Sequence, residues 1–366
     1  MAVELLKKLI SFQSVTPDDA GAFEFIESYL SDFKAEYFNR GGVKNLLLKK
    51  VFGNGEHLCF AGHIDVVPAG DGWSSDPFTA TEKDGFIYGR GTQDMKSGVA
   101  SMLESAKNIE NFSGTLSLLL TSDEEGEAKH GTLYVLEELK KRCELPDYAL
   151  ITEPTCEHEM GDTLKVGRRG SINGVIKIQG KQGHVAYPNK HINPVHLFAD
   201  KLPLIAGHKF DNGDAVFAPS QLMVTDIRGG MEVTNVTPDS LKIMFNIRNS
   251  TETNTTDVEN YLREVLDPLY SVDYSLDIEQ TSKSFQTERN SKIVKIAQNS
   301  VKEICSVEPT LSTSGGTSDA RFFGEFDIPV VEFGVKNDTI HSIDERTTAD
   351  EVEALYRVCL DILKSF

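Results

Sequence analysis

Six short segments that carry carboxylates or histidines are spread over most of the 366-residue chain. Histidine nitrogens and carboxylate oxygens, with no cysteine among them, are typical donors of hydrolytic zinc and manganese sites that keep one position open for water. The ordered set therefore predicts a metallohydrolase centre with two metal ions. In chain order the residues are His63 and Asp65, Asp94, Glu124 and Glu125, Glu153, His184, and His341.

Taken singly, each of these segments has a commoner explanation. His63 and Asp65 lie two residues apart, so in an extended segment both side chains point to the same side and the carboxylate can fix the imidazole tautomer. An isolated pair of this kind is more often a surface histidine near a turn. Asp94 alone is more often the cap of the helix that follows it, and adjacent acids such as Glu124 and Glu125 are usually a solvated pair.

Their position relative to apolar runs distinguishes these segments from such ordinary cases. Three of them follow directly after short apolar runs at 58–61, 116–120 and 148–151, which suit strands buried on both faces. Helical spacing of apolar residues occurs at 3–12, 22–33, 97–109 and 132–139. The alternation predicts an α/β fold with a mixed sheet and helices on both faces. Such sheets bind ligands beyond the carboxyl ends of their strands, so we expect the polar side chains at one edge.

A second unit is predicted to be inserted in the first. Strand patterns at 171–179, 217–227, 241–248 and 274–279, with helices at 194–205 and 258–266, follow the ferredoxin-like order. The helix at 293–304, the strand at 328–333 and the helix at 349–363 then return to the first pattern. The predicted organisation is a discontinuous catalytic domain, 1–169 and 283–366, with an inserted ferredoxin-like α+β domain at 170–282.

Composition excludes several classes of function. A formal charge of −19 argues against a nucleic-acid or anionic-membrane partner. Five cysteines without a CxxC pair fit reduced thiols better than a disulfide framework. The first residues lack the features of a signal peptide, and no apolar run approaches the roughly 20 residues that span a bilayer. We therefore expect a cytoplasmic protein.

The chain resembles the M20 family of co-catalytic metallohydrolases over essentially its full length. Three residues depart from the family pattern: Ser97, Thr152 and Asp344, the last of which adds a charge near the expected site. The matching stretches are 62–68, 73–78, 88–96, 123–126, 183–188 and 314–322.

The resemblance implies a ligand set for two zinc ions, which Co²⁺ or Mn²⁺ can replace. Asp94 would bridge both ions, and the peptide bond after it would be cis. His63 and Glu153 would complete the ligands of one ion, and Glu125 and His341 those of the other.

The resemblance also implies roles for residues that do not bind metal. Glu124 would be the general acid and base, and Asp65 would orient His63. His184 would hydrogen-bond the oxyanion and would come from the inserted domain of a partner subunit. The inserted domain would therefore act in dimerisation and as a lid, and the protein would be a homodimer.

The expected substrate is a small anionic N-acyl amino acid whose linear amide bond is hydrolysed. A chain with excess negative charge needs local cations to bind it, and arginine can hold a carboxylate with two hydrogen bonds. By resemblance, the contacts would be Lys165, Arg168, Ser171, Tyr187, Asn235, Arg248, Gly315, Thr317, Arg321 and Asn337.

Two alternatives remain open. One is another amidohydrolase of the same family, such as an acetylornithine deacetylase or a dipeptidase. The arginine set and the 315–321 stretch argue against it and favour a branch that acts on a multiply charged acyl amino acid. The other is a binding protein that has lost its chemistry, although such a relative should lack Glu124 or a ligand, and all are present.

Overall fold

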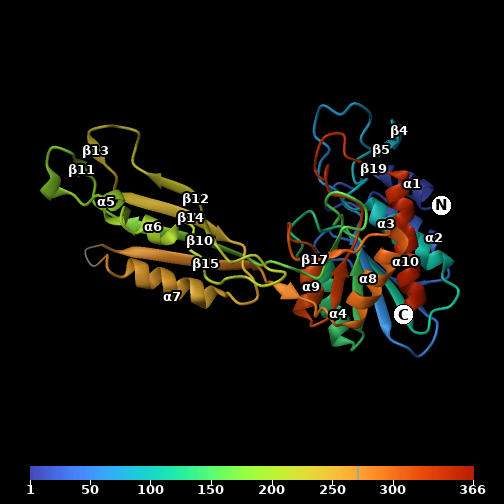
Figure 1. The fold of residues 1–366 in the computed structure, drawn as a ribbon. Coiled ribbons are helices and arrows are strands. Elements are labelled where there is room, and N and C mark those ends of the chain that lie inside the picture. Colours follow the sequence, from blue (N-terminus) through green and yellow to red (C-terminus); the bar gives the residue numbers. More distant parts are fainter. Residues whose placement is uncertain (270–271) are drawn as a thin grey trace. The chain divides into compact units, whose positions relative to one another are not determined.

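The computed structural model describes residues 1–269 and 272–366 (Figure 1). The chain forms two compact units. The first consists of Met1–Gly167, Gln286–Ser312 and Ser318–Phe366, and the second of Arg168–Phe285 and Thr313–Thr317. The short return of the chain to the second unit at 313–317 was not expected, because so short a segment has no periodic pattern of its own.

The first unit is built on an eight-stranded mixed sheet, which confirms the α/β prediction. Strands β6, β3, β7 and β18 are neighbours and run parallel, so their carboxyl ends lie at one edge. Across the sheet the order is β1 (Lys34–Tyr37), β2 (Asn45–Val51), β6 (Thr115–Thr121), β3 (His57–His63), β7 (Tyr148–Ile151), β18 (Val330–Glu332), β8 (Thr163–Lys165) and β17 (Thr310–Ser312).

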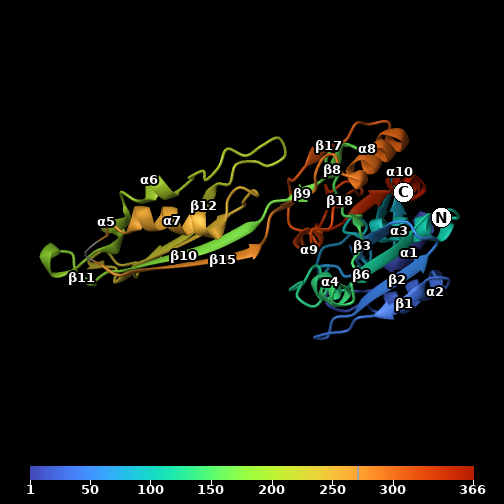
Figure 2. The same cartoon turned by 90° about the horizontal axis from the view of Figure 1, so that it is seen from below.

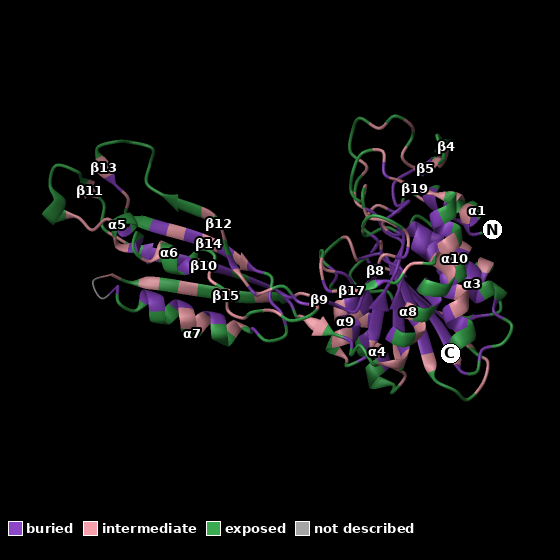
Figure 3. Cartoon of the chain, viewed as in Figure 1, coloured by how far each residue is buried: buried purple, intermediate pink, exposed green. Residues whose placement is uncertain are grey.

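Helices cover both faces of this sheet (Figure 2). On one face, α1 (Ala2–Ile10), α3 (Lys96–Asn108), α8 (Lys292–Cys305) and α10 (Ala349–Ser365) pack against one another. On the other face, α4 (Thr132–Lys141) packs with α9 (Ala320–Glu325). Helix α2 (Ala22–Tyr29) leads into β1, and its Tyr29 hydroxyl donates to Glu104 of α3. The central strands are buried (Figure 3), which explains why β3 and β6 read as continuous apolar runs rather than as alternating ones.

A small antiparallel sheet brings two distant parts of the first unit together. It consists of β19 (Arg346–Thr348), β5 (Phe86–Tyr88) and β4 (Thr81–Lys83). Arg346 pairs with Tyr88, so the loop that follows β5 meets the loop that precedes β19. The sequence patterns did not predict these three-residue strands.

The second unit has the predicted ferredoxin-like topology, with strand order β12-β14-β10-β15 and antiparallel pairing throughout. Its core is formed by buried side chains such as Ile176, Ile243 and Leu262. The strands are β10 (Ser171–Gln179), β12 (Leu222–Gly229), β14 (Ser240–Ile247) and β15 (Tyr274–Ser282), and the helices are α5 (Pro194–Phe198), α6 (Leu202–Ile205) and α7 (Thr255–Leu266). Shorter elements are β9 (Gly167–Arg168) with β16 (Phe285–Gln286), β11 (Gly183–His184) with β13 (Val236–Thr237), and the 3₁₀ turn Pro188–Lys190.

Two predicted elements of the second unit were too long. The helix expected at 194–205 is interrupted between α5 and α6, because Pro203 has no N–H and is tolerated only in a first helical turn. The strand expected from 217 begins at Leu222, and Pro219 in the preceding loop cannot donate to a strand partner. Among the described residues, no helix is both long and apolar enough to cross a membrane.

Candidate metal centre

The carboxyl edge of the parallel strands collects the predicted ligands. His63 is the last residue of β3, Glu125 follows β6, and Glu153 follows β7. His341 lies in the loop after β18, and Asp94 lies in the loop before α3, where the Asp94–Met95 peptide bond is cis, as expected.

Gly91 allows the tight turn that presents Asp94. Its φ of +87° is a conformation that side chains other than glycine rarely adopt. A Cβ at this position would also lie 2.9 Å from both Lys96 and Val66. Gly98, at the start of α3, is equally restricted, since a Cβ there would meet the Thr152 carbonyl oxygen at 2.2 Å. The absence of a side chain thus lets α3 pass close to the segment that carries Glu153.

A first group of ligand atoms surrounds His63, which is 1% exposed. Its Nε2 atom lies 3.0 Å from Asp94 Oδ1 and 3.6 Å from Glu153 Oε1. Its Nδ1 atom lies 2.8 Å from the Asp65 main-chain oxygen, a contact that fixes the proton on Nδ1 and leaves Nε2 as a ligand atom.

A second group surrounds His341, whose side chain is about half exposed. Its Nε2 atom lies 2.9 Å from Glu125 Oε1 and 3.3 Å from Asp94 Oδ2. Asp94 therefore points one oxygen at each histidine, which is the arrangement of a carboxylate shared by two groups.

The spacing and chemistry of these atoms fit divalent cations. Donor atoms bound tetrahedrally at about 2.0–2.1 Å lie roughly 3.3 Å from one another. The observed N···O distances of 2.9–3.6 Å are close to that value. His63, Asp94 and Glu125 also offer donor atoms that all lie within 4.8 Å of one another. The residues present can hold two ions, one in each group, with Asp94 common to both.

The carboxylates around the two histidines raise the pKa of both rings. Hydrogen bonds with Asp94 and Glu125 raise the pKa of His341 to about 10. Burial lowers the pKa of His63, but the hydrogen bond with Asp94 and the charges of nearby carboxylates outweigh it and raise that pKa well above its usual value. Burial acts to raise the pKa of Asp94, yet its bonds to both histidines leave it below its usual value.

Glu124 belongs to neither group of ligand atoms. Burial, together with the charges of Asp319, Asp94 and Glu125, raises its pKa well above the ordinary value. A carboxyl group with a raised pKa next to a hydrolytic centre can both accept and donate a proton near neutral pH.

Asp65 acts differently from the expectation that its carboxylate would hold the His63 imidazole. That carboxylate lies 3.6 Å from His63 Nδ1, whereas the main-chain oxygen of Asp65 lies closer. The carboxylate instead accepts the main-chain N–H groups of Glu124 at 3.4 Å and Glu125 at 3.1 Å. Asp65 thus fixes the turn on which both glutamates sit.

Sequence reasoning missed a further buried acid beside the site, Asp319. It accepts a hydrogen bond of 2.6 Å from the Thr132 hydroxyl, and its other oxygen is buried without a partner among the described residues. Burial raises its pKa to about 6. Its place within the 314–322 stretch that resembles the family was the only available signal.

The predicted substrate contacts divide between the two units. In the first unit, Lys165 is buried beside Ser312, and the Arg321 guanidinium stacks on the Phe322 ring. Asn337 is half-buried, and its N–H donates to the Cys156 carbonyl.

In the second unit, Arg168 donates to the carbonyls of Ser314 and Gly316 and so braces the 313–317 segment. A Cβ at Gly315 would meet that guanidinium at 2.9 Å. The hydroxyl of buried Ser171 accepts from Asn246.

The remaining contacts of the second unit are Arg248, Tyr187, Asn235 and Thr317. Arg248 is exposed, and its charge lies close enough to half-buried Arg169 to help burial lower the Arg169 pKa. Tyr187 and Asn235 are also exposed, and Thr317 is half-buried.

His184 lies on β11 of the second unit and is exposed. The main-chain N–H of Ala186 donates to its Nδ1 atom at 3.1 Å, so the neutral ring carries its proton on Nε2. The Asn235 carbonyl accepts from the N–H of the next residue, Val185, so these two segments lie side by side.

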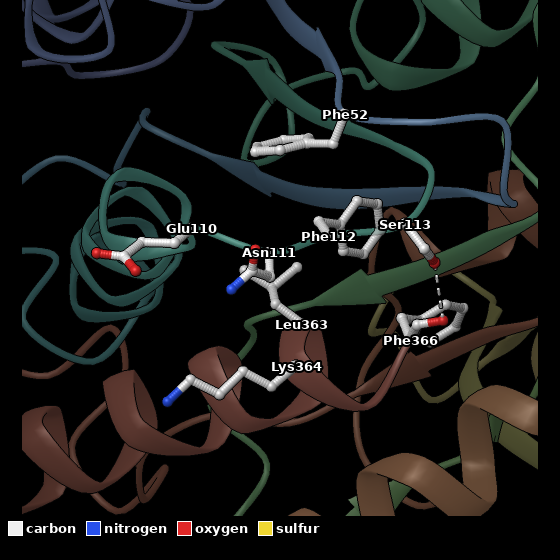
Figure 4. A pocket seen from close by; sticks show the side chains of 8 residues that line it. All are labelled: Phe52, Glu110, Asn111, Phe112, Ser113, Leu363, Lys364 and Phe366. Atoms are coloured by element: carbon white, nitrogen blue, oxygen red, sulfur yellow. Dashed lines mark hydrogen bonds between the residues drawn. The ribbon is translucent and has the colours of Figure 1, made fainter.

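A separate pocket of about 360 Å³ lies at the opposite, amino-terminal edge of the parallel strands (Figure 4). Phe52, Phe112 and Phe366 from three segments line it, and the Ser113 hydroxyl is 3.5 Å from the Phe366 main-chain oxygen. It contains none of the predicted ligands.

The chain belongs to the peptidase family M20/M25/M40, whose sequence model matches residues 59–365. The protein is therefore a metal-dependent hydrolase, as the sequence predicted. It is 58% identical to the succinyl-diaminopimelate desuccinylase of Nitratiruptor sp., covering 100% of this chain and 99% of that protein. It is 56% identical to the enzyme of the same name from Sulfurimonas denitrificans, covering 97% of each.

Solved structures share the fold. The aminopeptidase PepT of Bacillus cereus matches with a TM-score of 0.82 at 21% identity, covering 100% of this chain and 97% of that one. The YXEP protein of Bacillus subtilis, described as a dinuclear metal-binding peptidase of the M20 family, matches with a TM-score of 0.73 at 15% identity, covering 100% and 98%.

Proposed function

We propose that this protein is a succinyl-diaminopimelate desuccinylase. It hydrolyses N-succinyl-LL-2,6-diaminopimelate to succinate and LL-2,6-diaminopimelate, in lysine and cell-wall precursor biosynthesis. The observation that carries this proposal is an identity of 54–58% with relatives of that name over 97–100% of the chain. Five free cysteines, three of them buried, suit the reducing cytoplasm in which we place the enzyme.

The proposed cofactor is a pair of Zn²⁺ ions, which Co²⁺ or Mn²⁺ can replace. His63, Asp94 and Glu153 would hold one ion, and Asp94, Glu125 and His341 the other. When bound, such ions lower the pKa of water and polarise a carbonyl oxygen.

Glu124 is the proposed proton carrier. It takes a proton from the attacking water and passes it to the amide nitrogen as the C–N bond breaks, which frees the amine and leaves the succinate carboxylate. Its raised pKa and its exclusion from both ligand groups support this role. The Asp65 carboxylate accepts the main-chain N–H groups of Glu124 and Glu125. It thereby fixes the position of the proton carrier Glu124 relative to the proposed metal ligand Glu125.

His184 is the proposed donor to the oxygen that becomes negatively charged in the tetrahedral intermediate. The exposed ring and its Nε2–H, which has no partner among the described residues, support this role, because such a group can donate to an incoming oxygen. We assign the role to the partner subunit's His184 in a homodimer. An edge strand with exposed apolar side chains supports dimerisation: on β12, Met223 is 57% and Ile227 46% exposed.

The basic residues named above are the proposed contacts to the carboxylates of the substrate. Arg168, Arg248 and Arg321 supply guanidinium groups, and Lys165 a point charge. The hydroxyl and amide groups of Ser171, Tyr187, Asn235, Thr317 and Asn337, with the main chain of Gly315, complete the set.

The test compares three substrates on one preparation of known metal content. N-succinyl-LL-diaminopimelate, N-acetylornithine and a dipeptide are each assayed for amine release, before and after chelation and again after addition of Zn²⁺ or Co²⁺. We expect the succinyl substrate to be preferred, and its hydrolysis to be lost with the metal and restored on addition. Preference for N-acetylornithine or the dipeptide, or full activity in metal-free protein, would refute the proposal.

A further inference from the structure

Two loops of the first unit carry Asp94 and His341, and each is bonded to the other by a side chain that is not a ligand. The first, here called the Asp94 loop, spans residues 89–95. The second, the His341 loop, spans residues 338–345. They are about 250 residues apart in the sequence, and the bonds between them run from Glu345 to one loop and from Gln93 to the other.

The Glu345 carboxylate holds the main chain of the Asp94 loop. Its two oxygens accept the N–H groups of Gly91 at 2.9 Å, Gln93 at 2.8 Å and Asp94 at 3.1 Å. The Arg90 guanidinium donates to the same carboxylate at 2.7 Å, and both side chains are 1–2% exposed. A buried acid with four donors fixes the loop firmly, because its removal leaves each donor buried without an acceptor.

The Gln93 side chain holds the His341 loop in return. Its Nε2 atom donates to Asp338 Oδ1 at 2.7 Å. Its Oε1 atom accepts the main-chain N–H of Thr339 at 2.9 Å and the Thr339 hydroxyl at 2.8 Å. Thr339 precedes His341 by two residues, and its hydroxyl also accepts the N–H of Arg346 at 3.1 Å. Gln93 therefore restricts the position of the loop that carries the His341 ring.

We propose that Gln93 and Glu345 are positioning residues, of which Gln93 acts on one metal ion and Glu345 on both. Gln93 orients the loop of His341, which belongs only to the ligand group completed by Glu125, so it governs one ion. Glu345 holds the main chain of Asp94, which is common to both groups, so it governs both. This inference deepens the proposed function and rests on its two-metal centre.

The test measures metal affinity in two variants of the full chain. Zn²⁺ and Co²⁺ are titrated into metal-free Gln93→Met and Glu345→Gln proteins in competition with a chelator of known affinity. Loss of a residue that supports a ligand typically weakens metal binding by about 10–100-fold. We expect Gln93→Met to bind one ion as the wild type does and the other about 10–100-fold more weakly. We expect Glu345→Gln to weaken both.

Activity at increasing metal concentration separates positioning from general damage. Excess Co²⁺ should restore the kcat of Gln93→Met with KM unchanged, since only occupancy of one site is impaired. Thermal unfolding of the metal-free proteins shows whether Gln93→Met folds normally. Methionine is similar in length to glutamine, so Gln93→Met should fold normally. If Glu345→Gln proves unstable, the metal affinities of Gln93→Met alone test the proposal.

Two matched controls come from the same loops. Asp338→Asn keeps an oxygen opposite Gln93 and should bind both ions like the wild type. Asp344 is the neighbour of Glu345, and its own carboxylate accepts hydrogen bonds from the main-chain N–H and the hydroxyl of Ser74. Asp344→Asn should also leave both metal affinities unchanged.

The outcomes separate this inference from the proposed function. A Gln93→Met protein that keeps both affinities, or loses both equally, overturns the assignment. Two-ion binding by a wild type that does not hydrolyse the succinyl substrate overturns the proposed substrate, while the same titrations still decide the roles of Gln93 and Glu345. A wild type that binds a single ion overturns the proposed pair of metal ions and this inference with it, whichever substrate it hydrolyses.

Discussion

At the scale of single residues, the adjacent acids Glu124 and Glu125 show how chemically identical side chains acquire different roles. The turn after β6 sends Glu125 to within 2.9 Å of His341, while Glu124 joins neither ligand group. Asp65 holds the main chain of both. The direction of each side chain is thus set by the turn, and a change of one glutamate should have a different effect from a change of the other.

Replacing Glu124 by Gln should abolish turnover and spare the metal. A general base or acid typically contributes about 10²–10⁴-fold, and Glu124 serves as both, so the loss in kcat should reach or exceed the upper end of that range. Metal content should stay at the wild-type value. Glu125→Gln is the matched control, because it should lose metal along with activity; the reverse pattern would mean that the two roles are exchanged.

Metal binding should release protons from the two histidines. Imidazole binds metal only in its neutral form. Hydrogen bonds with Asp94 and Glu125 raise the pKa of His341 to about 10, so this ring is protonated at pH 7 in the metal-free protein, and the pKa of His63 is raised as well. We expect protons to be released when both sites fill at pH 7, at least the one that His341 carries, and the affinity to rise with pH. Calorimetry in buffers of different ionisation enthalpy measures the release. The His341→Gln protein should release fewer protons than the wild type. A heat of metal binding that does not depend on the buffer would contradict the predicted proton release.

At the scale of elements, the predictable part of the site is the part built by long apolar strands. Residues 58–61, 116–120 and 148–151 mark β3, β6 and β7, and burial on both faces gives them a signal that the sequence alone reveals. Their parallel order then places His63, Glu125 and Glu153 together.

The remainder of the site depends on contacts that leave no local pattern. Strands β5 and β19 have three residues each, too few for a periodicity to be recognised. Their pairing joins segments that are remote in sequence, and the bonds of Glu345 to main-chain N–H groups place no demand on neighbouring side chains. For the same reason Gln93, Asp319 and Glu345 were missed, whereas the ligands, which are recognisable by type, were not.

His57, the first residue of β3, should make the folded protein less stable at acidic pH. Burial, with the charge of Lys49 adding to it, lowers the pKa of His57 to about 4, and its Nε2 atom lies 2.8 Å from the Ser117 hydroxyl. The unfolded chain takes up this proton near pH 6.5 but the folded chain only near pH 4, so stability present above pH 6.5 is lost as the pH falls through that window.

His57→Gln should therefore reduce the loss of unfolding free energy between pH 7 and pH 4.5, by about 1–3 kcal/mol. Urea unfolding at the two pH values measures it. His158→Gln, at an exposed position, is the control and should follow the wild type. An equal acid sensitivity in all three proteins would show that His57 does not titrate as described.

At the scale of the whole molecule, the two units divide the chemistry between them. The first contains every proposed metal ligand and Glu124, and the second contains His184. A dimer in which His184 serves the partner's site makes each active site dependent on both chains, so two different inactive proteins can complement each other.

Mixing Glu124→Ala and His184→Ala subunits should restore activity. If the proposed homodimer is correct, each variant alone would be inactive, whereas a heterodimer would combine an intact first unit with the partner subunit's His184 and hold one complete site. After dissociation and reassociation of equal amounts, about a quarter of wild-type activity is expected, because half of the dimers are mixed and each has one working site of two. Mixed dimers that form, by mass, yet stay inactive would place His184 in its own subunit's site.

The short return of the chain at Thr313–Thr317 also sets an order of events during synthesis. Ribosomes add about 5–20 residues per second, and domains generally fold as they emerge. The second unit, although its strands end at Ser282, is not complete until residue 317 has left the ribosome, since Thr313 bonds to Val216 and Arg168 to Ser314 and Gly316. The first unit waits longer still, for β18 and α10. The unit whose synthesis begins first is thus the last to be finished, and a nascent chain that stalls before its final helix leaves uncovered the sides of α3 and α8 against which α10 packs.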